Sequence, residues 1–261
     1  MQALKAVILG IVEGATEFLP VSSTGHLIIA SDWLHYPVAQ RATFEIFIQL
    51  GAIVAVYWHY RSDLVDLARR AAYERSAREL IAKVLLAFVP AAVVGLLFHH
   101  WIEEHLFSVH AVAVALIVGG AIIWAIELRP QRPSVERMEA MGWSEAVWVG
   151  LAQVTSLYPG VSRAAATIVG GMVAGMSRPA ATQFSFYLAL PTLTAASLFS
   201  LLKAAKTITS DEATSLAIGF AAAFVTALFV IRGFLRYVQS HDFRPFAYYR
   251  IAFGLLLLVL S

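Results

Sequence analysis

Residues 13–26 read EGATEFLPVSSTGH, and the interpretation of the whole chain starts from this stretch. Two glutamates four positions apart precede a proline, two serines, a threonine, a glycine and a histidine. On a helix both carboxylates project from one face, because residues four apart lie one above the other. Pro20 and Gly25 then interrupt that helix. The stretch is therefore predicted to be a broken helix with ionisable groups on both sides of the break.

The sequence around this stretch is apolar, as is the chain as a whole. Of its 261 residues, 59% are hydrophobic and 14% are charged, whereas soluble domains average about 45–50% and about 25%. Too few charges remain to cover a soluble surface. The net charge of +2 is too small to indicate a nucleic-acid partner, and the lack of cysteine excludes thiol chemistry. We expect a single integral membrane domain over residues 1–261.

Six stretches are long and apolar enough to cross a bilayer, which takes about 20 residues. They are residues 44–60, 81–98, 111–128, 180–202, 214–236 and 246–261. Two more apolar stretches, 2–30 and 146–176, are broken by Gly, Pro, Ser and charged residues. Broken backbone cannot face lipid, because its polar groups would go unpaired. The predicted fold is an all-α polytopic membrane protein, with about six transmembrane helices and two re-entrant helix–loop–helix segments.

Most of the 19 Lys and Arg residues fall in the loops that follow the first, third and fifth predicted spans. Arg250 is predicted to belong to the third of these basic loops. Cytoplasmic loops carry an excess of positive charge, so all three are expected in the cytoplasm and both termini outside.

The sequence also contains a weak internal repeat: a segment that begins at Gly10 resembles a segment that begins at Gly150, at an offset of about 140 residues. In the first copy GIVE precedes FLPVSS, and in the second GLAQ precedes LYPGVSR. Three predicted spans separate the copies, so the second must be inverted. Inverted repeats with broken helices place their binding site near the midplane, where the breaks meet. We expect repeat one over about 1–128 and repeat two over about 129–261.

Ionisable side chains at membrane depth are costly and usually line a functional cavity. Repulsion between Glu13 and Glu17 would be relieved by a shared proton, a cationic partner or a divalent metal. The second break contributes Arg163, whose guanidinium matches phosphate oxygens with paired hydrogen bonds. Free N–H groups at a helix break also attract anions. If the breaks meet, they form a phosphate site from Glu13, Glu17, Ser22, Ser23, His26 and Arg163.

These motifs resemble those of the undecaprenyl-diphosphate phosphatases, also described as bacitracin-resistance proteins. The matching stretches are 13–26, 44–52, 159–163 and 184–191, and the resemblance runs nearly end to end. One position departs from the family, which usually has a serine after the arginine of the second motif. This chain has Ala164 there, and Ser162 and Thr167 are the hydroxyls left nearby.

The resemblance implies a hydrolase that converts undecaprenyl (polyprenyl) diphosphate to the monophosphate and inorganic phosphate. Its place would be the bacterial cytoplasmic (inner) membrane, with the active site open to the outer, periplasmic side. The monophosphate carrier is reused for peptidoglycan and other cell-wall glycans, and the activity confers bacitracin resistance. The family is described as dependent on divalent metal, which makes Glu13 and Glu17 the candidate ligands of Mg²⁺ or Ca²⁺.

The catalytic candidates are the six phosphate-site residues of the two breaks. In one route Ser23 or His26 attacks the terminal phosphorus, and in the other His26 orients a water and protonates the leaving group. The sequence does not choose between these routes. Candidates for substrate binding are Thr24, Gly25, Gln49, Ser162 and Thr167.

Inverted repeats with broken helices are also transporter architecture. A lipid or small-molecule transporter, or flippase, with an intramembrane phosphate site is therefore the alternative. Hydroxyl, imidazole and paired carboxylate groups around one gap favour the enzyme, because transport does not require them. The expected partners are the polyprenyl diphosphate lipid and the membrane, and the helix-packing surfaces also permit a homodimer.

Overall fold

The computed structural model of the protein describes residues 2–106, 108–129, 132–204 and 210–260. Within these ranges the chain is helical and has no β-strand, although one isolated bridge pairs Val135 with Met176. In chain order the helices are α1 Gln2–Thr16, α2 Ser23–Trp33, α3 Val38–His59, α4 Arg61–Ala71, α5 Arg75–Leu106, α6 Val109–Glu127, η1 Met138–Ala140, α7 Trp143–Val154, η2 Thr155–Leu157, α8 Arg163–Val173, α9 Arg178–Ala204, α10 Ser210–Tyr237 and α11 Arg244–Leu260.

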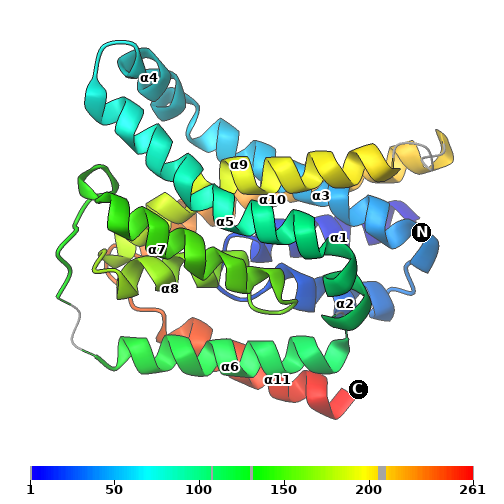
Figure 1. The fold of residues 1–261 in the computed structure, drawn as a ribbon. Coiled ribbons are helices and arrows are strands. Elements are labelled where there is room, and N and C mark those ends of the chain that lie inside the picture. The colour runs from blue at the N-terminus through cyan, green and yellow to red at the C-terminus, as the bar shows by residue number, and fades with distance from the viewer. Residues whose placement is uncertain (1, 107, 130–131, 205–209, 261) are drawn as a thin grey trace.

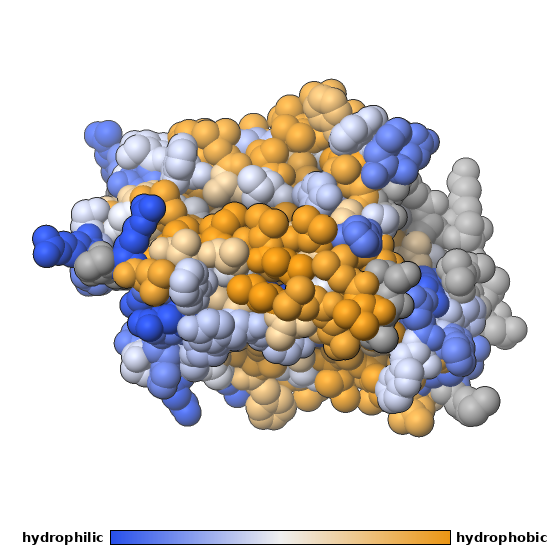
Figure 2. Space-filling view, turned by 90° about the horizontal axis from the view of Figure 1, so that it is seen from below, coloured by the Kyte–Doolittle hydropathy of each residue, from blue (hydrophilic) through white to orange (hydrophobic). Residues whose placement is uncertain are grey.

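Five of the described helices, α3, α5, α6, α9 and α10, are long and apolar enough to cross a membrane. The sixth predicted span, 246–261, corresponds to α11, which has 17 residues and is shorter than each of these five helices. The surface agrees with the assignment: apolar side chains fill the middle of the face where α6 and α11 lie, and polar residues gather at both ends (Figure 2). The prediction of an all-helical polytopic membrane protein is confirmed.

Both segments that were predicted to break form helix–turn–helix hairpins, α1–α2 and α7–α8. The α1–α2 hairpin extends inward from the end of the molecule where α1 begins and α11 ends (Figure 1). The α7–α8 hairpin extends inward from the opposite end, on the side where α4 lies. The tips of the two hairpins therefore approach each other inside the bundle.

The packing partners of the two halves correspond. Helix α1 packs against α10 as α7 packs against α5, while α3 packs against α9 and α6 against α11. This exchange of partners is the pattern expected of an inverted repeat. The repeat boundary at about residue 128 stays a prediction.

Close packing of α1 on α10 draws the first hairpin into the bundle. A Cβ atom on Gly10 would collide with the backbone of Gly219, and one on Gly14 with the backbone of Ala223. Small residues four apart let two helix backbones approach in this way. The consequence is burial of the two glutamates at the end of α1, whose exposed fractions are 2% for Glu13 and 7% for Glu17.

Candidate active site

The first break lies between Thr16, where α1 ends, and Ser23, where α2 begins. Pro20 lies in this turn, where its missing N–H costs no helical hydrogen bond. Ser22 precedes α2 with a φ of 71°, in the left-handed region that is strained for a non-glycine residue. Its side chain makes no capping hydrogen bond to α2. The first N–H groups of α2 therefore lack a side-chain cap and favour an anion.

The second break also contains a serine with a positive φ directly before a helix. Gly160 has a φ of 93° and Ser162 a φ of 73°, and Ser162 directly precedes α8. Here the serine does cap its helix, because Ser162 Oγ accepts a hydrogen bond of 3.2 Å from the Ala165 N–H. Ser22 and Ser162 thus occupy equivalent strained positions, but only Ser162 uses its hydroxyl as a cap.

Glu17 joins the two breaks. Its Oε1 accepts from Nη2 of Arg163 at 3.3 Å, and its Oε2 accepts from Oγ of Ser23 at 2.8 Å. The ion pair is buried, with side-chain exposures of 7% for Glu17 and 8% for Arg163. The structure therefore brings three of the predicted catalytic residues into direct contact, two from the first break and one from the second. Their catalytic roles stay predictions.

Arg163 is also held by helix α9. Its Nη1 donates to the backbone oxygen of Ser185 at 3.1 Å and to Ser185 Oγ at 3.3 Å. Thr167, a predicted substrate-binding residue, is completely buried, and its Oγ1 lies 2.6 Å from the same Ser185 Oγ. Nε of Arg163 has no hydrogen-bond partner. The guanidinium is thus fixed in place and still has one N–H to offer.

Glu13 is buried one turn before Glu17, and its Oε2 has no hydrogen-bond partner. An unsatisfied buried carboxylate oxygen is costly, so it fits a site for a cation. The described residues contain no cluster of three or more Asp, Glu, His or Cys suited to a metal. Mg²⁺ is commonly held by one or two carboxylates together with substrate phosphates. Glu13, with Glu17, fits that mode and not a metal cage built from protein groups alone.

His26 lies one turn along α2 from Ser23 and contacts α11. Its Nδ1 is 2.7 Å from the carbonyl oxygen of Ser22 and its Nε2 is 2.6 Å from the hydroxyl of Tyr249. A carbonyl only accepts, so Nδ1 carries the proton, and Nε2 of the neutral ring accepts from Tyr249. The imidazole also stacks on Phe253, with ring centroids 4.3 Å apart. His26 is thus held in one tautomer with Nε2 as its basic nitrogen.

The remaining predicted residues, Thr24, Gly25 and Gln49, form no hydrogen bond with Glu17 or Arg163 among the described contacts. Gln49 on α3 accepts from Ser197 of α9 at 3.0 Å. Gly25 faces side chains of α6 and α11, among them Leu116, where an added Cβ would be 3.3 Å away. Thr24 is partly buried on the first turn of α2. Gly25 allows close helix packing, and a role for Thr24, Gly25 or Gln49 in binding stays a prediction.

The prediction that Arg250 belongs to a cytoplasmic basic loop is wrong, because this residue is completely buried on α11. Its Nη1 donates to the carbonyl of Pro20 at 3.1 Å, and its Nη2 to that of Gly160 at 3.1 Å. Two carbonyls of α6, those of Ala115 and Leu116, accept at 3.2 and 3.4 Å. It forms no ion pair with a carboxylate within the described ranges. Arg250 therefore ties both breaks to α6.

Sequence reasoning missed Arg250, Ser185 and Tyr249. Arg250 carried a usable signal, because a charged residue within the apolar stretch 246–261 meets the criterion that selected Arg163. Ser185 lies within the motif at 184–191, yet nothing in the sequence distinguishes it from other serines in apolar helices. Tyr249 is identified only by its contact with His26, 223 positions away in the chain.

Chemically, the site joins the carboxylate of Glu17, the hydroxyl of Ser23 and the guanidinium of Arg163. Glu13 is buried one turn away, and Arg250 binds the backbone of both breaks. Arg163, Arg250 and the N-terminus of α2 supply positive potential. Glu17 accepts a hydrogen bond from the hydroxyl of Ser23, as a group that receives its proton would. Such a site suits an anion with several oxygens whose charge is redistributed during reaction.

The chain was compared with known proteins. Residues 6–256 match the family described as bacitracin resistance protein BacA. A relative from Nitrosospira multiformis, named undecaprenyl-diphosphatase, is 50% identical over 98% of this chain and 94% of its own length. Relatives of the same name from Nitrosomonas europaea and Thermoanaerobacter pseudethanolicus are 47% and 48% identical, over 98% of this chain and 93% and 96% of their own lengths. The chain therefore belongs to the bacitracin resistance protein BacA family.

Proposed function

We propose that this protein hydrolyses undecaprenyl diphosphate, or a similar polyprenyl diphosphate, to the monophosphate and inorganic phosphate. The observation that carries the proposal is the buried contact of Glu17 with both Ser23 and Arg163, which joins two helix breaks within the membrane bundle. The name undecaprenyl-diphosphatase, carried by relatives that are about half identical, supports the same substrate. No observation on the described residues favours the transporter alternative.

In the reaction a bond between the terminal phosphorus and the bridging oxygen breaks, and the elements of water are added. Arg163 binds the phosphate oxygens through its unpartnered Nε and stabilises the charge that develops on them. Ser23, with its proton directed at Glu17, is placed as a nucleophile or as a group that orients water. His26 accepts and releases a proton at Nε2, and the hydroxyl of Tyr249 relays that proton.

A divalent ion, Mg²⁺ or Ca²⁺, would be held by Glu13 and Glu17 together with the substrate phosphates. When bound, such an ion neutralises phosphate charge. The unpartnered Oε2 of Glu13 supports this assignment. Until the ion and substrate arrive, Glu17 is neutralised by Arg163, which explains how two adjacent carboxylates are tolerated inside the bundle.

The proposed location is the bacterial cytoplasmic membrane, with the site open to the outer side. The basic loops on the α4 side support a cytoplasmic position for that end of the molecule. The α1–α2 hairpin then extends inward from the outer side. Hydrolysis there would return the monophosphate carrier to peptidoglycan and cell-wall synthesis.

The test is phosphate release from undecaprenyl diphosphate by the purified protein in detergent, with and without a chelator. Ser23→Ala and Arg163→Ala are assayed beside the unaltered protein, and thermal unfolding of each variant confirms that it is folded. Chelator-sensitive release that both substitutions abolish is expected. Absence of release by folded, unaltered protein across several lipid diphosphates and metals would overturn the proposed function.

A further inference from the structure

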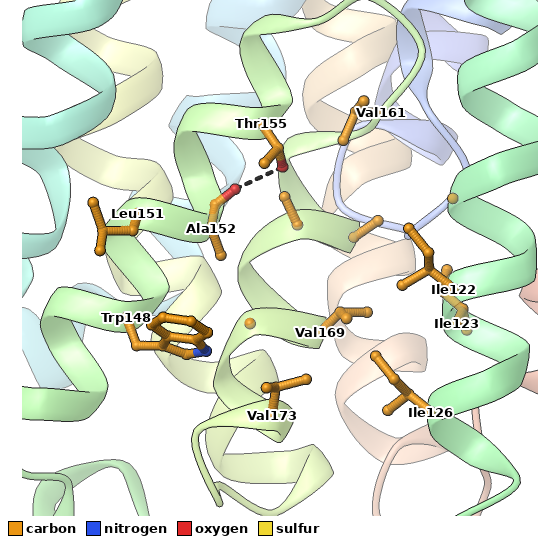
Figure 3. A pocket seen from close by; sticks show the side chains of 14 residues that line it. Ile122, Ile123, Ile126, Trp148, Leu151, Ala152, Thr155, Val161, Val169 and Val173 are labelled. Carbon is orange, nitrogen blue, oxygen red and sulfur yellow. Dashed lines mark hydrogen bonds between the residues drawn. The ribbon is translucent and has the colours of Figure 1, made fainter.

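An apolar groove of about 390 Å³ lies between α6 and the second hairpin. Figure 3 shows Ile122 and Ile126 of α6 on one side and Val169 and Val173 of α8 on the other, with Trp148 of α7 at its edge. Thr155 contributes the only hydroxyl among its lining residues, and that hydroxyl already donates to the carbonyl of Ala152 at 2.7 Å. Apart from this hydroxyl and the indole N–H of Trp148, the side chains that line the groove are apolar.

One end of the groove is part of the candidate active site. Val161 and Ala165 line it, and these residues flank Ser162 and Arg163 of the second break. From there the lining follows one face of α8 as far as Val173. At 1.5 Å per residue, the 11 residues of α8 extend about 16 Å. The opposite face of α8 packs on α9, the helix whose Ser185 binds Arg163. Helix α8 therefore lies between the groove and α9.

The wall formed by α6 is also linked to the breaks. Gly119 lines the groove, and a Cβ atom there would collide with the guanidinium of Arg250. That guanidinium donates to the carbonyl of Gly160, beside Val161. The near end of the groove thus has Arg163 and Arg250 close behind it, while the rest of its lining is apolar. An amphiphile with an anionic head and an apolar chain matches this distribution.

We propose that this groove binds the polyprenyl chain of the substrate while the diphosphate lies at the two breaks. The inference rests on the proposed function. It commits to one occupant because the groove starts at the second break, so a chain attached to a phosphate held by Arg163 would enter it at Val161. An acyl chain of a membrane phospholipid has no such attachment and is the competing outcome.

The first experiment places bulk at the two ends of the groove, with Ala166→Trp near the break and Val173→Trp at the far end. Hydrolysis is compared for farnesyl diphosphate, with three isoprene units, and undecaprenyl diphosphate, with eleven. Val173→Trp is expected to lower the ratio of kcat/KM for the long substrate over the short one by about tenfold. Ala166→Trp obstructs the near end and lowers kcat/KM for both substrates. Val118→Trp is the matched control, because Val118 is about as exposed on α6 as Val173 is on α8, at 51% and 54%, and lies outside the groove.

The expected result is a changed ratio for Val173→Trp and an unchanged ratio for Val118→Trp. Equal losses for both substrates in Val173→Trp, or no loss at all, would overturn the groove assignment. So would a changed ratio in the control variant, since general disturbance of the lipid-facing surface would then explain the result.

The second experiment does not depend on turnover. An undecaprenyl diphosphate with a photoreactive diazirine in its chain is irradiated with the unaltered protein, and the labelled peptides are identified by mass spectrometry. Label on residues 119–126 and 161–173, removed by excess undecaprenyl diphosphate but not by phospholipid, supports the proposal. Label spread over all lipid-facing helices, or removed equally by phospholipid, contradicts it. Specific label without phosphate release would retain the chain-binding groove and reject the hydrolase.

Discussion

The carboxylate of Glu17 neutralises the charge of Arg163 and also positions the hydroxyl of Ser23. It receives the hydroxyl of Ser23 on one oxygen and the guanidinium of Arg163 on the other, so it fixes both groups relative to each other. The desolvation of a buried ion pair is costly, and a contact of 3.3 Å offsets that cost only in part. A phosphate that enters the site adds negative charge beside Arg163. Substrate binding thus uses a cation that the protein alone leaves incompletely satisfied.

Arg163→Lys separates charge from geometry. Lysine keeps the charge, but its single nitrogen cannot reproduce the planar guanidinium, whose Nη1 binds Ser185 and Nη2 binds Glu17 while Nε stays free for phosphate. We expect kcat/KM for undecaprenyl diphosphate to fall about 100-fold or more, the usual loss when a positioned donor is removed. Arg178→Lys is the matched control, since Arg178 pairs with buried Glu127 away from the site. Phosphate-release kinetics decide: similar losses in both variants would contradict a specific role for Arg163.

Arg250 illustrates a charged residue whose partners are all backbone. Four carbonyls from the two breaks and α6 accept its hydrogen bonds. No apolar side chain can replace these donors. Loss of the side chain would leave buried acceptors unsatisfied and a gap between α11 and the breaks.

We therefore expect Arg250→Met to destabilise the protein by about 3 kcal/mol or more, given roughly 1–3 kcal/mol for each unsatisfied buried group. Arg244→Met on the same helix should change stability by less than about 1 kcal/mol, because its ion pair with Asp242 is partly exposed. Thermal unfolding in detergent, followed by intrinsic fluorescence, compares the two. If they unfold at the same temperature, Arg250 does not hold the breaks together.

At the scale of the helical elements, the breaks are the features that local chemistry specifies most clearly. Proline in each motif predicts that the helix stops, and both hairpins are found where the apolar stretches are interrupted. The left-handed conformation of Ser22 and Ser162 could not be predicted. Serine has no intrinsic preference for that region, so the conformation is imposed by the surrounding bundle.

Ser22→Gly tests that strain. Glycine adopts a φ of 71° without the steric cost, which is roughly 1–2 kcal/mol for other residues. We expect the variant to be as stable as the unaltered protein or up to about 1 kcal/mol more stable, because glycine's flexibility in the unfolded chain offsets part of the gain.

Ser31→Gly, inside the same α2 helix, provides the contrast and should destabilise by roughly 0.5 kcal/mol, the difference in helix propensity between serine and glycine. Unfolding temperatures measured side by side would reveal the difference in sign. A clear loss of stability in Ser22→Gly would show that the serine side chain, and not the backbone strain, decides this position. Phosphate release by the same variant then tests whether the Ser22 hydroxyl is catalytic.

For the whole molecule, long-range contacts are what the sequence could not supply. The repeat and the charged residues predict that two breaks meet, and Glu17 with Arg163 confirms that contact. The contacts of Arg250 with Pro20 and Gly160 span 230 and 90 positions. Their acceptors are backbone oxygens, which every residue has, so no sequence pattern identifies them. Arg250 itself lies within the predicted span 246–261, so its burial, unlike its partners, follows from the criterion that selects Arg163.

The orientation in the membrane is open to a direct test because the chain contains no cysteine. Single cysteines are introduced at Trp33, the last residue of the first hairpin, and at Tyr73, after α4, both strongly exposed at 76% and 88%. If the basic loops are cytoplasmic, a membrane-impermeant maleimide should label Trp33→Cys but not Tyr73→Cys in intact spheroplasts. Labelling should reverse in inverted membrane vesicles.

The outcome also bears on the site. The α1–α2 hairpin carries Glu17 and Ser23 inward from the end of the molecule where Trp33 lies, so its orientation decides which leaflet is nearer the first break. Labelling of Tyr73→Cys from outside would place the α7–α8 hairpin on the outer side instead. That outcome would contradict the proposed orientation and, with it, the argument that the site opens to the outer side. Maleimide labelling of these two variants therefore tests the proposed direction of carrier recycling independently of the chemistry at Arg163.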